Sequence, residues 1–291
     1  MCNRVVSEPA VVITIDVEDW PQSTLDTSLE ITDRVVTNTH RVLDILGNHQ
    51  RKATMFVLGK VAERFPGLVK RIAHEGHEVA SHGYSHSNIG KQTVSEFRDD
   101  IERSKKLLED IIGKEVSGYR APDFSVTSGT LWALDVLAEV GFTYDSSIFP
   151  IRGSRYGIPW WPTYPVLVRL MSGRSIAEFP LATFQCFRRR WPVAGGGYHR
   201  LFPGFFVKWC IAQHFRQNVV FVAYYHPYEF APEEFSVLPF AVPLKLRLHQ
   251  GLGRHSLRAK FESILRKFHS VPCGRVVLSN LPLYQLESGA Q

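Results

Sequence analysis

Short apolar runs that are typical of β-strands alternate along this chain with amphipathic segments that are typical of helices. A β-branched run at residues 11–15 is followed at once by a cluster of acids, the run at 78–81 leads into His82, and the run at 219–225 ends at His226. Such alternation predicts a parallel sheet or barrel covered by helices. In barrels of this kind the catalytic side chains gather at the carboxyl ends of the strands. The pattern therefore predicts an α/β fold with these polar residues on one rim.

The remaining periodic segments fill in the order of elements. A further strand-like run lies at 53–58, and a final one at 275–279. Helical spacing is found at about 31–49, 66–74, 94–112 and 128–140. We expect one domain over residues 1–291, with a barrel core at about 10–230, an aromatic and glycine-rich loop insertion at about 151–206, and a basic, helical C-terminal extension at about 231–291.

Composition places the chain among soluble globular proteins. Hydrophobic residues make up 44% of it and charged residues 21%. The four cysteines are scattered without a CxxC pair, which argues against a disulfide framework and against a zinc site built from thiolates. The first residues lack the apolar core of a secretion signal, and the longest apolar runs are shorter than the roughly 20 residues that cross a bilayer. We therefore expect a cytoplasmic protein that does not span a membrane.

The net charge of +6 is concentrated late in the chain. Its cations include Arg258, Lys260, Arg266 and Lys267. A solvated helix face is the simplest interpretation, and peripheral contact with an anionic membrane at its inner face is the functional alternative. No nucleic-acid-binding motif accompanies the charge, so we expect no nucleic-acid partner. The oligomeric state is unknown from the sequence.

Two histidines four residues apart, His82 and His86, indicate a metal site together with the acids that follow the first strand. Imidazole nitrogens and one carboxylate suit Zn²⁺, with Co²⁺, Mn²⁺ or Ni²⁺ as alternatives, and they leave a coordination position open for water. Asp16, Glu18 and Asp19 supply more acid than one ligand position needs. The surplus carboxylate is a candidate general base.

Four segments, at residues 14–20, 82–86, 119–122 and 225–229, resemble in identity, order and spacing the motifs of the polysaccharide deacetylase (NodB-homology) family. The resemblance implies a distorted (β/α)7 barrel that hydrolyses N-acetyl groups from sugars with a bound divalent metal. The acidic cluster, the segments at 145–150 and 195–198, and the basic tail are more specifically similar to deacetylases encoded with exosortase-linked exopolysaccharide systems.

The resemblance also implies roles for individual residues. Asp16 would be the general base, Arg120 would pair with it, and Asp145 would orient Arg120, although a turn or helix cap is the alternative for Asp145. The metal and backbone N–H groups near Asp123 and Phe124 would stabilise the oxyanion. His226 would protonate the leaving amine.

The chain departs from the family pattern at the acids. Most members have adjacent aspartates, one base and one ligand, whereas this sequence reads Asp-Val-Glu-Asp at 16–19. The metal ligand is therefore Glu18 or Asp19; strand alternation places Glu18 on the face of Asp16 and favours it. The unused acid is expected to be a turn or cap residue. Candidate substrate contacts, each of which could equally be a packing residue, are Trp20, Tyr84, Pro122, Asp123, Phe124 and Tyr224.

Three functions compete at this point. The first is removal of acetyl from an N-acetylhexosamine in a bacterial glycan or its lipid-linked precursor, which the expected cytoplasmic location would favour over an exported polymer. The second is hydrolysis of a small cyclic or linear amide on the same fold, in some relatives without metal. The third is an inactive glycan-binding module. Base, acid, arginine and metal ligands are all present, which argues against an inactive module.

Overall fold

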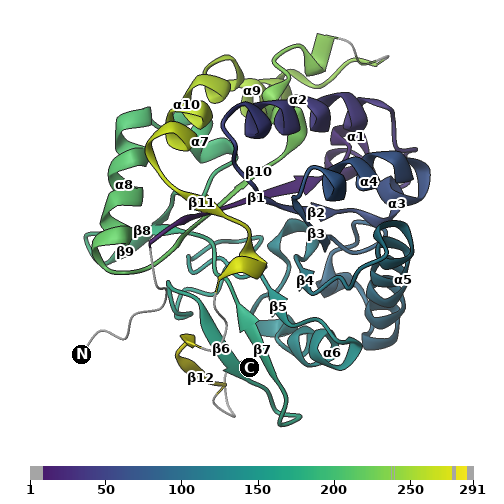
Figure 1. Cartoon of the computed structure of the whole chain (residues 1–291), viewed down its shortest axis with the longest axis vertical. Coiled ribbons are helices and arrows are strands. Elements are labelled where there is room, and N and C mark those ends of the chain that lie inside the picture. The colour runs from purple at the N-terminus through teal and green to yellow at the C-terminus, as the bar shows by residue number, and fades with distance from the viewer. Residues whose placement is uncertain (1–8, 237, 239, 277–279, 287–291) are drawn as a thin grey trace.

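One mixed sheet organises the molecule (Figure 1). The computed structural model describes residues 9–236, 238, 240–276 and 280–286. The strands of the main sheet follow the order β10-β1-β2-β3-β4-β5-β7-β6-β12, with β11 paired to β1. Their bounds are β1 Val11–Val17, β2 Thr54–Val57, β3 Glu78–Ser81, β4 Gly118–Tyr119, β5 Tyr144–Asp145, β6 Val166–Arg169, β7 Ser175–Glu178, β10 Phe221–Tyr225, β11 Ser270–Val271 and β12 Leu283–Gln285.

The strands from β10 through β1 to β5 and β7 pair in parallel, so their carboxyl ends share one rim. The chain that follows β7 then lies against the free edge of β10. The Ala182 N–H donates to the Val222 carbonyl at 3.2 Å, and the Tyr224 N–H donates to the Ala194 carbonyl at 2.9 Å. This contact brings the two ends of the parallel sheet together. The expected distorted (β/α)7 barrel is confirmed.

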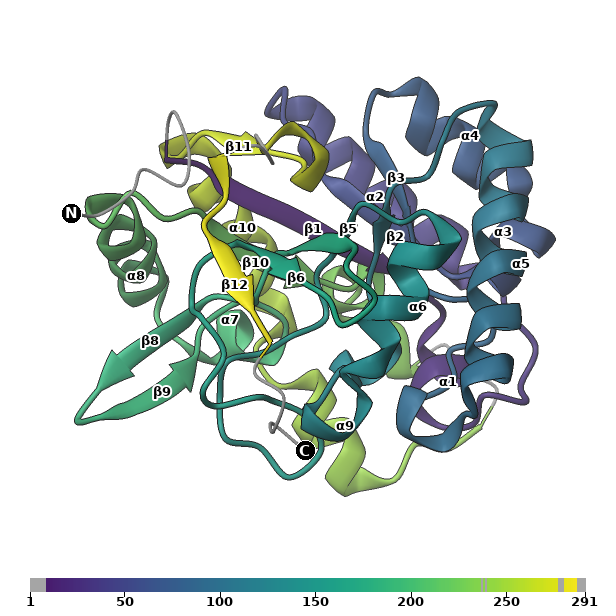
Figure 2. The same ribbon diagram turned by 90° about the horizontal axis from the view of Figure 1, so that it is seen from below.

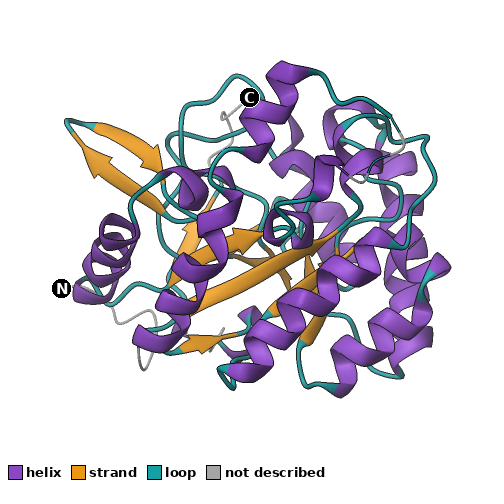
Figure 3. Cartoon of the chain, turned by 90° about the horizontal axis from the view of Figure 1, so that it is seen from above, coloured by secondary structure: helices purple, strands orange, loops and turns teal. Residues whose placement is uncertain are grey.

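Helices cover the outer face of the sheet (Figures 2 and 3). Their bounds are α1 Trp20–Thr24, α2 Arg34–Asn48, α3 Gly59–Arg64, α4 Pro66–His74, α5 Val94–Ile112, α6 Trp132–Val140, α7 Gly197–Leu201, α8 Gly204–Arg216, α9 Leu244–Gly251 and α10 Arg254–Lys267. The predictions for 66–74 and 94–112 match α4 and α5, whereas the helix predicted from 31 begins at Arg34.

Local chemistry sets both ends of α5. The Thr93 hydroxyl accepts from the Glu96 N–H at 3.2 Å, and the Glu96 carboxylate accepts from the Thr93 N–H at 2.7 Å, which is a capping box. Gly113 ends the helix with φ of 65°, a conformation in which the absence of Cβ removes the steric cost. Between these caps, Phe97, Ile101 and Leu108 are buried.

The segment from 151 to 206 differs from the loop insertion predicted for it. It contains β6 and β7, which enter the main sheet, and the separate antiparallel hairpin of β8 (Thr183–Cys186) and β9 (Arg189–Pro192). The prediction of loops is therefore wrong for these strands. Each of them is only four residues long, and their polar residues hide the alternation that would reveal a strand.

The C-terminal extension is helical, as expected, and packs on the barrel. On α10, Leu257, Phe261 and Leu265 are buried, and β11 extends the sheet beside the start of β1. The predicted strand at 275–279 falls partly on residues 277–279, which lie outside the described residues. Within the described part of the chain, Cys186, Cys210 and Cys273 are free thiols, and none of the helices is both long and apolar enough to span a bilayer.

Candidate active site

The rim formed by the strand carboxyl ends gathers the polar residues predicted for catalysis. Asp16 lies in β1 near its end and Glu18 directly follows that strand, His82 follows β3, Arg120 follows β4, and His226 follows β10. Asp16, Glu18, His82 and Arg120 are buried in the folded chain. Charged groups are buried only when they are paired or bind ions, so this rim is a site rather than a surface.

Glu18, His82 and His86 converge on one point. The Oε2 atom of Glu18 lies 2.7 Å from Nε2 of His86 and 3.3 Å from Nε2 of His82. One ligand atom from each residue lies within 4.8 Å of the others. Although burial alone would raise it, the pKa of Glu18 is well below its usual value because of the charge of His86 and the close approach of both imidazoles. The three side chains form a compact donor set for a cation.

Asp19 is not part of this cluster. Its Oδ2 atom accepts a hydrogen bond of 2.7 Å from the Thr32 N–H, which ties the loop after α1 to the end of β1. Burial raises the pKa of Asp19 to about 6. Asp19 as a metal ligand is therefore wrong for this arrangement, and strand alternation correctly separates it from Glu18.

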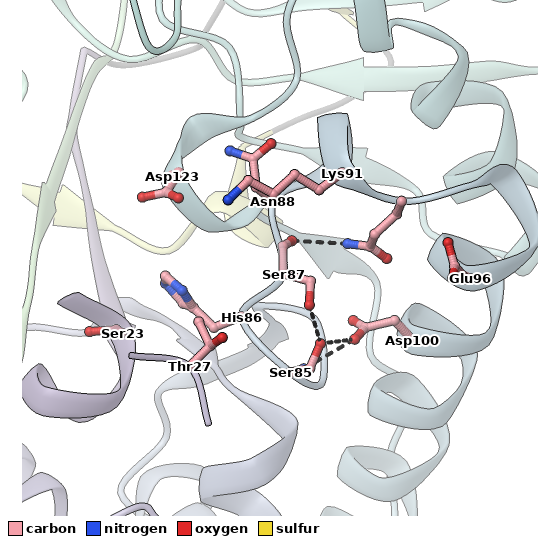
Figure 4. A pocket seen from close by; sticks show the side chains of 11 residues that line it. Ser23, Thr27, Ser85, His86, Ser87, Asn88, Lys91, Glu96, Asp100 and Asp123 are labelled. Carbon is pink, nitrogen blue, oxygen red and sulfur yellow. Dashed lines mark hydrogen bonds between the residues drawn. The ribbon is translucent and has the colours of Figure 1, made fainter. Parts of the chain in front are cut away.

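The loop that carries the two histidines is held by Asp100 of α5. One carboxylate oxygen of Asp100 accepts from the Tyr84 N–H at 2.6 Å, and the other accepts from the Ser85 N–H at 3.1 Å and the Ser85 hydroxyl at 2.6 Å (Figure 4). Gly83 and His86 both have positive φ, at 72° and 63°. The sequence analysis missed Asp100, because a polar residue on an amphipathic helix gives no local sign of what it contacts.

The Arg120 side chain links the carboxylate of Asp16 to neighbouring hydroxyl and carbonyl groups. Its Nη1 donates to Oδ1 of Asp16 at 2.8 Å and to the Thr14 hydroxyl at 2.6 Å. The other guanidinium nitrogens donate to the backbone carbonyl and the hydroxyl of Ser146, both at 2.8 Å. The guanidinium also lies 4.3 Å from the centre of the Phe56 ring. These contacts fix the orientation of the Asp16 carboxylate.

Asp145 does not hydrogen-bond to Arg120 within the described residues. It accepts from the N–H and hydroxyl of Ser147, at 3.2 and 2.5 Å, which corresponds to the alternative of a turn cap. Its other partner is Glu178, which faces it across the β5–β7 pairing. Burial raises the pKa of both carboxyl groups, that of Glu178 well above its usual value. Asp145 therefore does not orient Arg120 through a hydrogen bond, but its charge acts on the guanidinium; Glu178 was not predicted from the sequence.

His226 lies beside the set of Glu18, His82 and His86 and close to Asp16. Its Nε2 lies 3.9 Å from Oδ2 of Asp16 and 3.7 Å from Oε1 of Glu18. Its Nδ1 hydrogen-bonds to Oε2 of Glu229 at 3.2 Å, and Glu229 in turn pairs with Arg200 at 3.0 Å. Burial works against protonation, but the bond to Glu229 and the carboxylate charges around it raise the pKa of His226 to about 9. The imidazole therefore carries a proton at neutral pH.

Beside this cluster lies a cavity of about 400 Å³, lined in part by His86, Ser87, Asn88, Lys91 and Asp123 (Figure 4). Of the predicted substrate contacts, Asp123 lines it. Pro122, Phe124 and Tyr224 are buried next to the rim, with the Phe124 and Tyr224 rings 4.8 Å apart.

Two of the predicted substrate contacts are wrong in this arrangement. Trp20 is fully buried against Phe235. Tyr84 turns toward α3 and α5, where its hydroxyl donates to Glu63 at 2.6 Å and its ring lies under the guanidinium of Arg103.

The backbone after Arg120 has an unusual conformation. Asp123 and Phe124 adopt φ of 57° and 51°, which is rare and strained for residues other than glycine. The Phe124 N–H donates to the Ala121 carbonyl at 3.2 Å, so it is already engaged, and the expected oxyanion contact stays a prediction. Strain of this kind is concentrated at functional sites, and it agrees with a functional rim.

Comparison with known proteins finds two family models that match this chain. Residues 4–144 match the family model described as Polysaccharide deacetylase, and residues 146–278 match that described as Domain of unknown function (DUF3473). A peptidoglycan-N-acetylglucosamine deacetylase of Bacillus cereus is 40% identical over 98 residues, which is 33% of this chain and 36% of that protein. The alignment thus spans about a third of that relative's length.

Solved structures share the fold. A protein of Mycobacterium smegmatis, described as a polysaccharide deacetylase, superposes with a TM-score of 0.65 at 20% identity, over 98% of this chain and 94% of its own. Puue allantoinase superposes with a TM-score of 0.59 at 12% identity, over 92% and 88% of the two chains. These identities show the fold alone. The family match at 4–144, which contains the acidic cluster, the paired histidines and Arg120, assigns that part of the chain to the polysaccharide deacetylase family.

Proposed function

We propose that this protein removes acetyl groups from N-acetylated sugars of a glycan, with a divalent metal ion held by Glu18, His82 and His86. The observation that carries the proposal is the convergence of these three side chains beside the Asp16–Arg120 pair and His226. The family match supports the same chemistry. Each of these groups has a distinct part in hydrolysing an amide.

The donor set fits a divalent cation such as zinc. Two imidazole nitrogens and one carboxylate oxygen are the ligands of many catalytic zinc sites, and cobalt, manganese and nickel accept similar sets. His82 donates its Nδ1 proton to the Arg120 carbonyl at 2.8 Å, so its Nε2 is directed toward the cluster with a free lone pair. A cation bound there would act as a Lewis acid and lower the pKa of water.

Asp16 is suited to accept the proton of the attacking water. Its Oδ1 is engaged by Arg120 at 2.8 Å, whereas Oδ2 points toward the space between Glu18 and His226. One oxygen is therefore fixed and the other keeps lone pairs for a proton.

His226 is suited to complete the reaction. An amide carbon cannot expel an unprotonated amine at neutral pH, so the leaving nitrogen needs an acid. With a pKa of about 9, His226 has that proton, and Glu229 at 3.2 Å holds the ring in place. Base and acid candidates thus lie 3.9 Å apart beside the Glu18 carboxylate.

The substrate class rests on the relatives and on the cavity. The Bacillus cereus relative is named for peptidoglycan N-acetylglucosamine, which supports an N-acetylhexosamine as the reacting sugar. The cavity beside His86 is open and polar, as a subsite for a neighbouring sugar would be. The choice between a polymer and a lipid-linked precursor, and a cytoplasmic location, stay predictions.

The test is acetate release from N-acetylglucosamine oligosaccharides by chelator-treated protein, resupplied separately with zinc, cobalt, manganese or nickel. Activity that disappears with chelator and returns with metal is the expected result. Acetate release that is indifferent to chelator would favour metal-free hydrolysis of amides instead. An absence of release with every metal, on oligosaccharides and on nucleotide sugars, would contradict the proposal.

A further inference from the structure

The β8–β9 hairpin projects from the body of the molecule beside α8 (Figures 2 and 3). Its tip and the neighbouring side of α8 carry exposed aromatic rings, with 96% of Phe187, 74% of Phe205 and 51% of Trp191 accessible to solvent. We call the hairpin patch the set Phe187, Arg188, Arg189, Trp191, Phe205 and Trp209. Single exposed apolar residues are ordinary, but a cluster of large rings indicates a binding surface.

The two residues of the hairpin turn are unfavourable in the backbone conformation that they adopt. Phe187 and Arg188 form the two-residue turn between the paired residues Cys186 and Arg189, with φ of 47° and 62°. A turn with two positive φ angles strongly prefers asparagine and glycine, because other side chains are strained in this conformation. The demands of the turn therefore do not explain an aromatic and a cationic residue at its tip.

The hairpin is anchored to α8, so the hairpin patch is one surface. The ring of Phe184 on β8 lies 5.7 Å from that of Phe206 and 5.1 Å from that of Trp209. The Phe206 and Trp209 rings are themselves stacked at 5.8 Å. These contacts hold the hairpin strands in place while the tip stays exposed.

Along the sequence, the charge of the hairpin and of α8 has one sign, although Arg200 between them is buried and paired with Glu229. Residues 179–228 contain six lysines and arginines and no aspartate or glutamate. The net charge of this segment therefore equals the net charge of +6 of the whole chain. Arg188 and Arg189 are exposed, and within the described residues neither side chain makes a hydrogen bond or ion pair. An unneutralised cationic surface of this kind attracts anions.

Three of the C-terminal cations, by contrast, are engaged within the protein. Arg258 and Arg266 both pair with Glu262 on the same helix. Lys260 donates to the backbone carbonyls of His199 and Arg200, at 3.2 and 2.7 Å. Peripheral membrane contact, which the sequence assigned to this helix, is better supported at the hairpin.

We propose that the hairpin patch docks the protein on the surface of a bilayer that contains anionic phospholipids. Tryptophan and phenylalanine rings partition into the interfacial region of a membrane, and arginines bind the phosphate groups above it. The hairpin patch presents both at one tip. A glycan platform would combine its rings with hydrogen-bonding acids and amides, and no acid is present in this part of the sequence.

The experiment is co-sedimentation of the full chain with vesicles of phosphatidylcholine, with and without 30% phosphatidylglycerol, at low and high salt. Binding to the anionic vesicles alone, weakened by salt, is expected. Each cation near an anionic surface contributes roughly fivefold in affinity, so R188Q/R189Q should weaken binding by about 30-fold. F187A/W191A should weaken binding at both salt concentrations, because it removes the apolar contribution.

Matched variants separate this surface from general charge and hydrophobicity. R258Q/R266Q removes the same charge from α10, and L244A/L248A removes exposed apolar residues from α9, so both should bind within about twofold of the original. Thermal unfolding checks that every variant is folded. Equal loss in the α10 variant, absence of binding to anionic vesicles, or hairpin variants that lose binding of N-acetylglucosamine oligosaccharides instead of vesicles would overturn the proposal.

Discussion

The Nδ1–H of His82 donates to the backbone carbonyl of Arg120 at 2.8 Å, while the Arg120 side chain donates to Asp16 at the same distance. One residue therefore fixes the ring of a metal-ligand candidate and the carboxylate of the base candidate. The β3–β4 pairing, with Ser81 opposite Tyr119, places the two residues at the same level of the rim. The relative position of the candidate metal ligand and the candidate base is thus set by backbone register.

Glu18→Gln should abolish tight metal binding, whereas Asp19→Asn should leave it within about threefold. Loss of a residue that merely supports a metal ligand typically costs 10- to 100-fold in affinity, so loss of a ligand should cost at least about 100-fold. Asp19 instead accepts the Thr32 N–H, a role that asparagine can fill. Zinc titration with a competing chromophoric chelator measures both. A larger loss in the Asp19 variant would contradict the assignment of Glu18.

Asp16→Asn and His226→Ala should each lower kcat for acetate release by roughly 10²- to 10⁴-fold, the usual contribution of a general acid or base. Neither residue is in the metal-ligand set, so metal affinity should change far less than in the Glu18 variant. Steady-state kinetics with saturating metal, beside a metal titration of the same preparations, separates the two effects. Kinetics unchanged in either variant would remove that residue from the mechanism.

Elements and site residues that depend only on nearby sequence could be predicted. The bounds of α5 follow from Thr93, Glu96 and Gly113, all close to its ends. The candidate metal ligands, which lie together in the structure, follow from a four-residue spacing and from strand alternation. Glu178 could not be found in this way, because it meets Asp145 through the pairing of β5 with β7, across 33 residues that contain another strand.

The direction in which a side chain points could also not be predicted from the sequence. Trp20 and Tyr84 stand next to predicted site residues, yet one turns into the core and the other toward α5. Which way a residue in a loop or short helix points depends on tertiary packing, and the sequence pattern contains no period that would reveal it.

Compared with the original protein, the Glu178→Gln variant should become more stable as the pH rises from 5 to 8. The folded pKa of Glu178 is raised by burial beside Asp145, so the unfolded chain releases a proton above about pH 4.5 that the folded chain keeps. The free energy of unfolding of the original protein therefore falls with rising pH, by up to about 1.4 kcal/mol per unit for one proton. Glutamine mimics the neutral acid and removes this dependence. Urea unfolding across the pH range measures this dependence, with Glu102→Gln on α5 as control. A constant difference between Glu178→Gln and the original would contradict the raised pKa of Glu178.

Gly195→Ala should destabilise the closure of the barrel by about 3 kcal/mol or more, from backbone strain and overpacking together. Gly195 has φ of 144°, and a Cβ there would lie 1.9 Å from the Tyr224 carbonyl oxygen. The matched control is Gly197→Ala, whose Cβ would meet only the end of the Arg200 side chain at 3.3 Å and should cost less than about 1 kcal/mol. Equal free energies of unfolding for the two variants would show that the Gly195–Tyr224 contact does not close the sheet.

His199 should make the fold sensitive to mild acid. Its Nδ1 and Nε2 hydrogen-bond to the Tyr225 hydroxyl at 2.7 Å and the Val193 carbonyl at 2.8 Å, and burial lowers its pKa to about 4. The unfolded chain binds a proton at this residue below about pH 6.5 while the folded chain does not, so its contribution to stability is complete above pH 6.5 and is lost as the pH falls toward 4. Between pH 6.5 and 5 the original protein should lose about 2 kcal/mol more than His199→Gln, because each unit is worth about 1.4 kcal/mol. Urea unfolding at the two pH values measures the difference, with His249→Gln as the control for removal of a histidine. Equal losses of unfolding free energy in all three proteins would show that the pKa of His199 does not change on folding.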